Sequence, residues 1–457
     1  MAFSNIDNQQ LGKFLQIAFA EGIRNQISND YRDWEYIQRE RVSDPQGREL
    51  RWFIQKSLGP SAVQYRNPNF TAAFPSAQQI STQELTAVFK EIDATIEIEY
   101  NMWKRAQKSG NVRYAEPLMV EIESKLTATK RQLSKDLYGD GTGVLGQLLA
   151  SSAVESGNVR FQLSTANTAR GHVGFFEFDE ICVLKTNAGG TSGFDSDLGT
   201  EPAYWKVVSR RRLDNTVLMQ PLDSSLAALS ISSISTDVTA GDVFYKYEQP
   251  TFPDLSSISD YATVTEVIAG LESLTADDGR TVHGNTHSGS TGGTRFDASA
   301  VQIDVSHIEA VMNDLKIAVG EGAYRWPMAC MAPETRSVFI ETRESDRRFN
   351  SWEDSKRGVR VFGYQHEDDS IEFKSSEYCP KTRIYMMPEA KASQGRVLEY
   401  HGTDFEPVQT EGGDKFHLKP ASTGGYERRI QTFLEGYGVL INKHPAACGV
   451  IDNFIIS

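Results

Sequence analysis

Apolar residues recur at steps of three and four between Pro117 and Leu137, and charged side chains fill half of the positions between them. This spacing places the apolar residues on one stripe of an α-helix. Pro117 suits the first turn, where its missing N–H would have no intrahelical partner, and Gly139 suits a left-handed stop after the last turn. The pattern predicts a helix over residues 117–138, roughly 30 Å long. Its buried stripe consists of Leu118, Ile122, Leu126, Thr129, Leu133 and Leu137.

Strict alternation of apolar and polar residues runs from Glu91 to Tyr100 and is typical of a β-strand with one apolar face. A second strand-like run, from Arg48 to Lys56, carries basic residues. We predict that the two runs form one long arm, whose acidic and basic side chains attract each other or a neighbouring chain. Because an isolated two-stranded ribbon is marginally stable in water, we expect another subunit to cover the face that carries Trp52. The candidate inter-subunit contacts are Arg48, Arg51, Trp52, Lys56, Glu91, Asp93, Glu97 and Glu99.

The rest of the chain divides into a β-rich stretch and an α/β stretch. Short runs of β-forming residues separated by Gly, Ser and Asn predict strands at 160–163, 174–178, 205–208, 216–219 and 242–245. Helical spacing and capping residues predict helices over 261–274, over 305–319 and from 333 onward. The segment 275–295 is rich in Gly, Ser, Thr and Asp, and we predict a mobile projection of the axial domain there; the alternative is a packed loop tied down by a neighbouring subunit.

Several of these features, in this order, resemble the major capsid proteins of tailed bacteriophages. The first is the helix that ends in Leu137-Tyr138-Gly139-Asp140-Gly141-Thr142-Gly143, preceded by a polar arm and an extended loop. The second is the strand-like run Cys379-Pro380-Lys381-Thr382-Arg383-Ile384-Tyr385-Met386. The third is the run Leu434-Glu435-Gly436-Tyr437-Gly438-Val439-Leu440-Ile441-Asn442, followed by a turn at His444-Pro445-Ala446-Ala447.

The resemblance implies an α+β fold of the Hong Kong 97-like kind, with an N-terminal arm, an extended β-loop, a peripheral domain built on a long spine helix, and an axial domain. The corresponding divisions are an arm over 1–45, an extended loop over 46–107, and a peripheral domain over 108–257 that holds the spine helix 117–138 and a β-rich stretch or insertion over 159–247. An axial domain over 258–422 and a C-terminal return to the peripheral domain over 423–457 follow.

The function implied by the resemblance is structural. Copies of the chain would assemble into hexamers and pentamers of an icosahedral shell around double-stranded DNA, in a virion assembled in the host bacterial cytoplasm. Portal, scaffolding and decoration proteins would be further partners. Two alternatives stay open: an encapsulin-like nanocompartment that holds cargo protein, and a phage tail or surface β-protein that binds receptors or glycans.

Composition narrows the possibilities further. The net charge of −14 disfavours tight binding of nucleic acid and suits a shell that encloses DNA without gripping its sequence. No apolar run approaches the ~20 residues of a membrane span, so we expect no membrane association. The four cysteines are far apart in the sequence and form no metal-binding or redox motif, which predicts reduced, mostly buried thiols.

The residue spacing of the candidate motifs does not match that of known phosphate-binding loops or metal sites. The run from Gly139 to Gly143 follows a helix instead of opening one, so we interpret it as a turn and not as a phosphate loop. His283 and His287 have no Cys or third His nearby, which disfavours a metal site. We therefore predict no catalytic, metal-binding or cofactor-binding residues, no cofactor, and a protein that is not an enzyme. The carboxylates that could hold Ca²⁺ only weakly are Asp277, Asp278 and Asp297.

Overall fold

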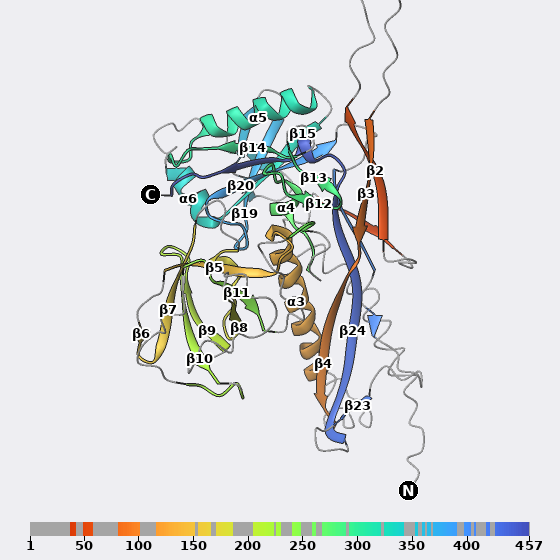
Figure 1. The fold of residues 1–457 in the computed structure, drawn as a ribbon, viewed down its shortest axis with the longest axis vertical. Helices are drawn as coiled ribbons and strands as arrows, with labels where there is room; N and C mark the ends of the chain where they lie inside the picture. Colours follow the sequence, from red (N-terminus) through yellow and green to blue (C-terminus); the bar gives the residue numbers. More distant parts are fainter. Residues whose placement is uncertain are drawn as a thin grey trace, which may run out of the picture.

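The computed structural model describes residues 37–42, 49–57, 81–100, 116–150, 154–165, 171–185, 204–223, 225–229, 240–247, 258–261, 267–288, 292–320, 324–341, 352–354, 359–361, 363–366, 369–390, 397–403, 406–407, 417–420 and 426–456 of the chain. Helices and strands are mixed along the sequence, which confirms the predicted α+β class. The long helix α3 and the strands β4 and β24 run side by side along the longest axis of the molecule (Figure 1).

A six-stranded sheet is organised around β24 (Tyr426–Asn442). This strand pairs antiparallel with β4 (Lys90–Glu99), from Arg429 opposite Glu99 to Gly438 opposite Lys90. The run from Leu434 to Asn442 and the turn after it, which are part of the resemblance, correspond to β24 and to the short 3₁₀ turn η6 (Pro445–Ala447). The remaining strands are β1 (Gln38–Arg41), β21 (Leu398–Gly402), β22 (Glu406–Pro407) and β23 (His417–Pro420).

The helix α3 (Glu116–Tyr138) confirms the predicted spine helix. The turn after it is also confirmed, but Gly139 is not its left-handed residue. Gly141 and Gly143 have the positive φ angles, 82° and 76°, and Gly139 instead donates its N–H to the Asp136 carbonyl at 3.1 Å. The chain reverses two residues later than the sequence suggested, since the side chain of Asp140 organises the turn by accepting the Thr142 amide at 2.9 Å.

Most of the β-rich stretch predicted over 159–247 belongs to a closed antiparallel barrel. Its strands are ordered β10-β9-β8-β11-β5-β7, and β10 also pairs with β7, so the sheet closes on itself. Stacked aromatic rings fill the interior: Phe161 lies edge-on to Trp205 and to Phe244, with ring centroids 5.0 and 5.1 Å apart. The strands are β5 (Val144–Ala150), β6 (Val154–Glu155) on the outside of β7, β7 (Asn158–Leu163), β8 (Ile181–Lys185), β9 (Tyr204–Arg211), β10 (Thr216–Leu222) and β11 (Val243–Lys246).

A second six-stranded sheet lies at the other end of the molecule, under the helix α5 (Figure 1). Its order is β14-β25-β20-β15-β19-β18, and it mixes parallel and antiparallel pairs. Because β25 belongs here while β24 belongs to the first sheet, the last segment of the chain is divided between two sheets. The strands are β14 (Thr294–Asp297), β15 (Tyr324–Met331), β18 (Gly363–His366), β19 (Asp369–Ser375), β20 (Arg383–Ala390) and β25 (Gly449–Asp452).

Two helices flank this sheet where the sequence predicted them. Asp304 caps α5 (Val305–Val319) in a reciprocal capping box with His307, and Gly320 follows the last turn with a φ of 83°. The buried stripe of α5 includes Ile308, Val311 and Leu315. The helix α6 (Pro333–Glu341) begins at the predicted proline.

Two local predictions are wrong. Helix α4 (Leu271–Leu274) is a single turn within the predicted 261–274 helix, whose residues 262–266 lie outside the described part. Gly270 immediately precedes this turn. The chain there passes so close to α3 that a Cβ on Gly270 would lie 2.0 Å from the Asp136 carbonyl oxygen. The predicted strand 174–178 is instead a 3₁₀ turn, η3 (Val173–Phe175), because the His172 side chain caps it through the Gly174 amide.

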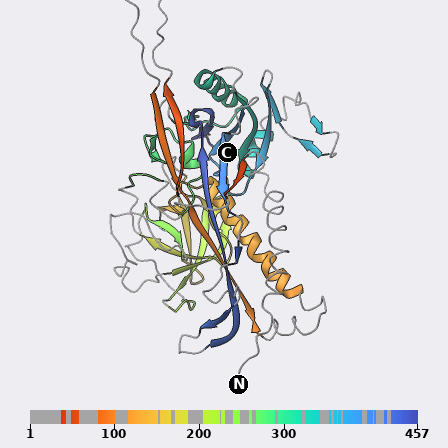
Figure 2. The ribbon, with the colours of Figure 1, turned by 90° about the vertical axis from the view of Figure 1, so that its right-hand side faces the viewer.

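Three small two-stranded ribbons complete the fold. The ribbon of β2 (Glu49–Ser57) and β3 (Ser81–Val88) lies at the edge of the molecule, at the upper end of β4, in both views (Figures 1 and 2). The others are β12 (Thr281–Val282) with β13 (Asn285–Thr286), and β16 (Trp352–Asp354) with β17 (Val359–Val361).

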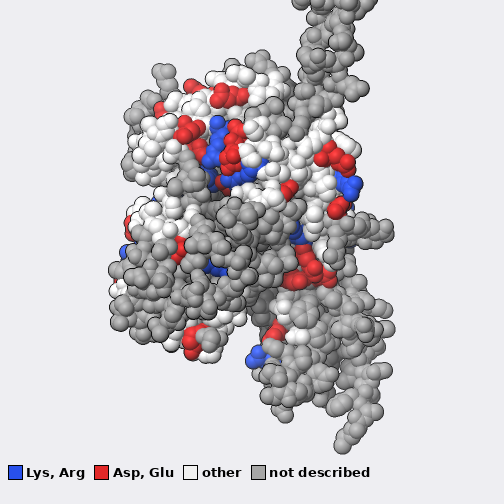
Figure 3. Space-filling view, viewed as in Figure 1, with Lys and Arg blue, Asp and Glu red and all other residues white. Residues whose placement is uncertain are grey.

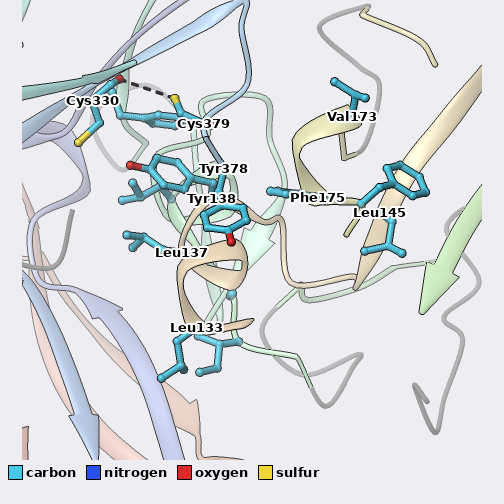
Figure 4. Packing of buried hydrophobic residues seen from close by; sticks show 14 of the residues in the cluster. Leu133, Leu137, Tyr138, Leu145, Val173, Phe175, Cys330, Tyr378 and Cys379 are labelled. Carbon is cyan, nitrogen blue, oxygen red and sulfur yellow. Dashed lines mark hydrogen bonds between the residues drawn. The ribbon is translucent and has the colours of Figure 1, made fainter. Parts of the chain in front are cut away.

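The main hydrophobic core joins α3, the barrel and both large sheets. Leu133, Leu137 and Tyr138 from the last turns of α3 meet Phe175 of η3 and Tyr378 of the loop before β20 (Figure 4). The thiol of Cys379 approaches the Cys330 carbonyl at 3.8 Å in the same cluster. A separate core under α5 packs that helix on the second sheet.

Candidate assembly interface

The β2–β3 ribbon has two faces of different character. Alternate residues Leu50, Trp52 and Ile54 point inward and are partly or fully buried. The opposite face carries Arg51 and Phe53, and 71% of Phe53 is exposed. An apolar ring surrounded by charged side chains is thus presented to the outside of the molecule.

The inner face of the ribbon docks on this same chain. Leu50 and Trp52 pack against Val439 and Ile441 of β24. The Trp52 ring lies edge-on to His283, in the turn between β12 and β13, with centroids 5.5 Å apart. The expectation that another subunit covers the Trp52 face is therefore wrong, because the chain's own hairpin and β24 cover it.

The pairing within the predicted arm is also different. Strand β2 pairs with β3, whereas β4 pairs with β24, so the two predicted partners lie in separate sheets. Arg51 consequently lies beside Glu49 and Glu84, at 3.1 and 3.4 Å, and not beside the acidic residues of β4. The expected attraction within one arm is thus wrong for Arg51; an attraction across a subunit boundary stays a prediction.

The acidic candidates on β4 have partners of their own. Glu97 accepts a hydrogen bond from Arg429 of β24 at 3.3 Å. Glu91 and Asp93 line a cavity beside α3. Glu99 lies opposite Arg429 in the strand register, and its side chain, like that of Lys56 on β2, lies outside the described part. Arg48 lies wholly outside the described residues.

The spine helix packs on the β4–β24 sheet. Leu133, from the predicted buried stripe, is 4% exposed and belongs to the same buried cluster as Leu440 of β24. The side chain of Leu126, another residue of that stripe, lies outside the described part. We refer to α3, β4 and β24, which lie side by side along the long axis of the molecule, as the beam.

A cavity of about 400 Å³ separates the barrel from the second sheet. The barrel is tied across it by the hairpin that joins β9 to β10. Arg212 makes a two-pronged ion pair with Glu334 of α6, at 2.6 and 3.1 Å, and also donates to the Glu377 carbonyl. The Lys381 ammonium donates to the Leu213 carbonyl at 3.1 Å. Basic and acidic atoms lie side by side on the surface below α5 (Figure 3).

The opposite wall of the cavity is an ion network. Glu272 of α4 accepts from Arg383 and from the Tyr385 hydroxyl, the latter at 2.9 Å. Arg280 pairs with Asp278, and Arg295 of β14 pairs with Asp452 of β25. Since each of these guanidinium groups already faces a carboxylate, the network is suited to joining segments rather than to binding a free anion.

A second cavity, of about 380 Å³, lies between α3 and β4. Asp136 lines it and accepts a hydrogen bond from Gln132 at 2.8 Å. Burial raises the pKa of Asp136 from 3.8 to about 6, although Gln132 and Lys135 oppose the change. Burial and the nearby Glu435 also raise the pKa of Asp93.

The buried histidine and the loop carboxylates near these cavities have structural partners. Buried His172 has both ring nitrogens engaged, with the Gly174 amide at 3.0 Å and the Tyr378 carbonyl at 2.8 Å, and burial lowers its pKa to about 3. No group of three or more potential metal ligands occurs among the described residues. Asp278 accepts a hydrogen bond from Arg280, and Asp297 accepts one from Asn453. These two carboxylates, which the sequence allowed as weak Ca²⁺ ligands, therefore have other partners in the fold. The predicted burial of the four cysteines is confirmed.

No helix in the described part of the chain has the length and apolar character needed to cross a membrane.

The segment 275–295 is packed where it is described, so the predicted mobile projection is wrong for residues 275–288 and 292–295. His283 and His287 are 4% and 2% exposed, and Gly293 donates its N–H to the Ala276 carbonyl at 3.0 Å. The loop is packed, but it is held by the chain's own β2–β3 ribbon and not by a neighbouring subunit: the Thr86 amide donates to the His283 carbonyl at 3.3 Å.

The sequence interpretation missed the docking role of His283 and the bridging role of Arg212. A signal was available for the first: Thr281-Val282-His283-Gly284-Asn285 has the composition of a tight hairpin, and the strong Gly and Ser content around it obscured this. No local signal marks Arg212, because its partner Glu334 lies far away in the sequence.

Comparison with known proteins gave structural similarities only. No protein-family model matches the chain, and no curated protein matches its sequence. A chain of the cyanophage A-1(L) capsid asymmetric unit is similar in structure, with a TM-score of 0.43 and 8% identity, over 93% of this chain and 94% of that chain. Mycobacterium phage Bobi gives a TM-score of 0.41 and 8% identity, over 93% of this chain and 90% of that chain. The holo-SrpI encapsulin complex from Synechococcus elongatus PCC 7942 gives a TM-score of 0.37 and 9% identity, over 94% of this chain and 90% of that chain.

Proposed function

We propose that the chain is a shell-forming structural protein, the major capsid protein of a tailed bacteriophage. One observation carries this proposal: the outer face of the β2–β3 ribbon, at the edge of the molecule, presents Phe53 with 71% of its surface exposed. Glu49 and Arg51 lie on the same face of β2, and Glu84 of β3 lies opposite Phe53 in the strand register. An apolar anchor with a polar rim is the typical anatomy of a protein interface.

The form of the molecule supports the same proposal. The beam of α3, β4 and β24 provides stiffness along the long axis, while the ribbon extends a thin element beyond it. A subunit of a closed lattice needs both, because each copy must hold its shape and contact several neighbours. Modest contacts repeated over many copies then add up to a stable shell without any single tight interface.

The domain division is part of the proposal. The arm would cover 1–45, the extended loop 46–107, the peripheral domain 108–257, and the axial domain 258–422, with 423–457 returning to the peripheral part. Hexamers and pentamers would close around double-stranded DNA, with portal, scaffolding and decoration proteins as partners. The particle would assemble in the host bacterial cytoplasm. The net charge of −14 supports a container that does not grip its DNA.

An encapsulin-like nanocompartment is the alternative within the same architecture, and a receptor-binding tail or surface protein is the alternative from another class. The mixed sheets and the internal beam favour a shell subunit over a fibre, whose repeats would stack along one axis.

Electron microscopy of the purified full-length chain tests the proposal. We expect closed shells or capsomer rings; fibres or dispersed monomers under all assembly conditions would contradict it. Nuclease-protected double-stranded DNA in particles from infected cells supports the capsid, whereas a protein cargo without DNA supports the nanocompartment.

A further inference from the structure

We propose that His283 forms a protonation-sensitive latch that holds the β2–β3 ribbon on the body of the subunit. The latch is a property of the single chain and does not depend on the proposed function. It rests on the contacts at the junction of ribbon and hairpin. The Thr86 amide donates to the His283 carbonyl at 3.3 Å, and the Gln83 side chain donates to the Gly284 carbonyl at 2.7 Å.

The ring of His283 is fixed from two sides. Its Nε2 lies 3.2 Å from the Leu440 carbonyl of β24, so this nitrogen carries the hydrogen and donates it. Its edge-to-face contact with Trp52 joins the ring to the ribbon, at 5.5 Å between centroids. The imidazole therefore lies between β24 and β2 and contacts both.

The second nitrogen of each imidazole is buried without a hydrogen-bond partner. This holds for Nδ1 of His283 and for Nδ1 of His287, and the Trp52 indole Nε1 at the same junction is likewise unpartnered. A neutral Nδ1 tolerates this situation as an unused acceptor. A protonated Nδ1 would place a charge in this buried site, which is far more costly, and for His283 the Thr86 backbone offsets that cost only in part.

The charged groups around the latch offer little compensation. Asp260 is the nearest carboxylate to His283, but it already accepts the backbone amides of His283 and Gly284, at 3.1 and 2.6 Å. Lys90 at the start of β4 acts against a charge on His283. His287 is opposed by His283 and Arg280 and favoured by Asp278, which pairs with Arg280. The charged residues of β2 and β3 whose side chains are described, Glu49, Arg51 and Glu84, lie on the outer face of the ribbon.

The direction of the pH effect follows from burial. Burial lowers the pKa of His283 from 6.5 to about 4, while a His283 exposed by release of the ribbon would return to about 6.5. The released state then binds more protons between these values, so docking is strongest above pH 6.5 and weakens as the pH falls toward 4. Between pH 7.5 and pH 5 the docking equilibrium should shift on the order of thirtyfold through His283.

Hydrogen exchange of the Thr86 amide in the full-length chain measures the latch, because this N–H donates across the junction. We expect its protection factor, corrected for intrinsic exchange, to fall at least about thirtyfold between pH 7.5 and pH 5. In the double variant His283→Gln, His287→Gln we expect little change over the same range. The matched control is His444→Gln, which alters another partly buried histidine, beside Tyr324, and should leave the fall intact.

A second measurement guards against a double variant that simply fails to dock. Titration of the ¹³C-labelled imidazoles in the unchanged protein should show that the charging of His283 coincides with the loss of Thr86 protection. The latch is disproved if wild-type protection is the same at pH 7.5 and pH 5. It is equally disproved if the docked double variant loses protection like the wild type, or if His444→Gln removes the effect.

Discussion

At the scale of single residues, buried polar groups fall into two kinds. His172 has a partner for each ring nitrogen and is fixed as a neutral group between the barrel and the loop before β20. Asp136 has a partner in Gln132 but lies at the end of α3, beside acidic Glu91 and Asp93 across a cavity. The first arrangement stabilises the neutral state that the residue prefers, whereas the second penalises the charged state that Asp136 adopts at neutral pH.

Asp136→Asn should therefore stabilise the protein above pH 6. The folded state holds a proton on Asp136 up to about pH 6, while the unfolded chain releases it near 3.8. The stability contribution of the protonated group is lost as the pH rises through that window, and the loss is complete above it. Urea unfolding should show a gain of about 1–3 kcal/mol at pH 7.5 and almost none at pH 3.5. Asp314→Asn, on the exposed side of α5, is the control and should change little at either pH.

Leu133→Ala tests the contact between the spine helix and the β4–β24 sheet. Leu133 is 4% exposed in the main core, so the truncation removes buried apolar surface and leaves a cavity. We expect the free energy of unfolding to fall by about 2–5 kcal/mol in chemical denaturation. Leu149→Ala, at a residue that is 48% exposed, should cost much less. Equal effects of the two variants would show that α3 is not held by this core.

At the scale of elements, local signals predicted helices well and strand partners poorly. The bounds of α5 follow from Asp304, Gly320 and the apolar period between them, all of which lie within a few residues of the helix. The alternation in β4 specifies a strand with one apolar face but not its partner. That partner, β24, lies more than 300 residues away, and the nearer β3 takes the place beside β2. Pairing is decided by packing over the whole chain, which no local pattern contains.

The packing of residues 275–288 and 292–295 has the same explanation. The composition of this segment predicts an entropic cost of ordering, and that prediction considers only the segment itself. The cost is offset by surfaces that come from elsewhere in the chain: Trp52 of β2 and the Leu440 carbonyl of β24 both contact His283. In the candidate interface, Phe53 could be placed on the outer face from alternation alone, but the dock beneath Trp52 could not.

The attachment of the barrel gives a prediction at this scale. Arg212→Gln would leave Glu334 without its two-pronged partner and remove a donor to the Glu377 carbonyl. Both charged side chains are about one-fifth exposed, so we expect a loss of about 1–3 kcal/mol in thermal or urea unfolding. Glu334→Gln in the Arg212→Gln background should cost little more, since the pair is already broken. The exposed neighbour Arg211 supplies the control, and Arg211→Gln should be nearly neutral. Additive losses in the double variant would mean that the two residues act independently.

At the scale of the whole molecule, the ribbon combines two requirements that oppose each other. Its inner face must hold to the body through Leu50 and Trp52, so that the ribbon has one position. In the proposed shell its outer face would have to remain open to a neighbour, and Phe53 there is 71% exposed in its own chain. A variant on the outer face should therefore separate assembly from folding, which a variant on the inner face cannot do.

Phe53→Asp is that variant. Because Phe53 is 71% exposed, the subunit's free energy of unfolding should change by less than about 0.5 kcal/mol. A carboxylate at the centre of the apolar patch would have to be desolvated without a partner in any contact with a neighbour, so assembly should be lost. Sedimentation velocity and electron microscopy of wild type and variant, at equal concentration, measure this. The matched control is Ile317→Asp, because Ile317 is also an exposed apolar residue, 82% exposed, but lies on α5 and not on the ribbon. We expect this variant to assemble. Normal particles from Phe53→Asp, with an unchanged unfolding curve, would show that the outer face of the ribbon does not contact neighbours, and the proposed interface would then have to lie elsewhere on the molecule.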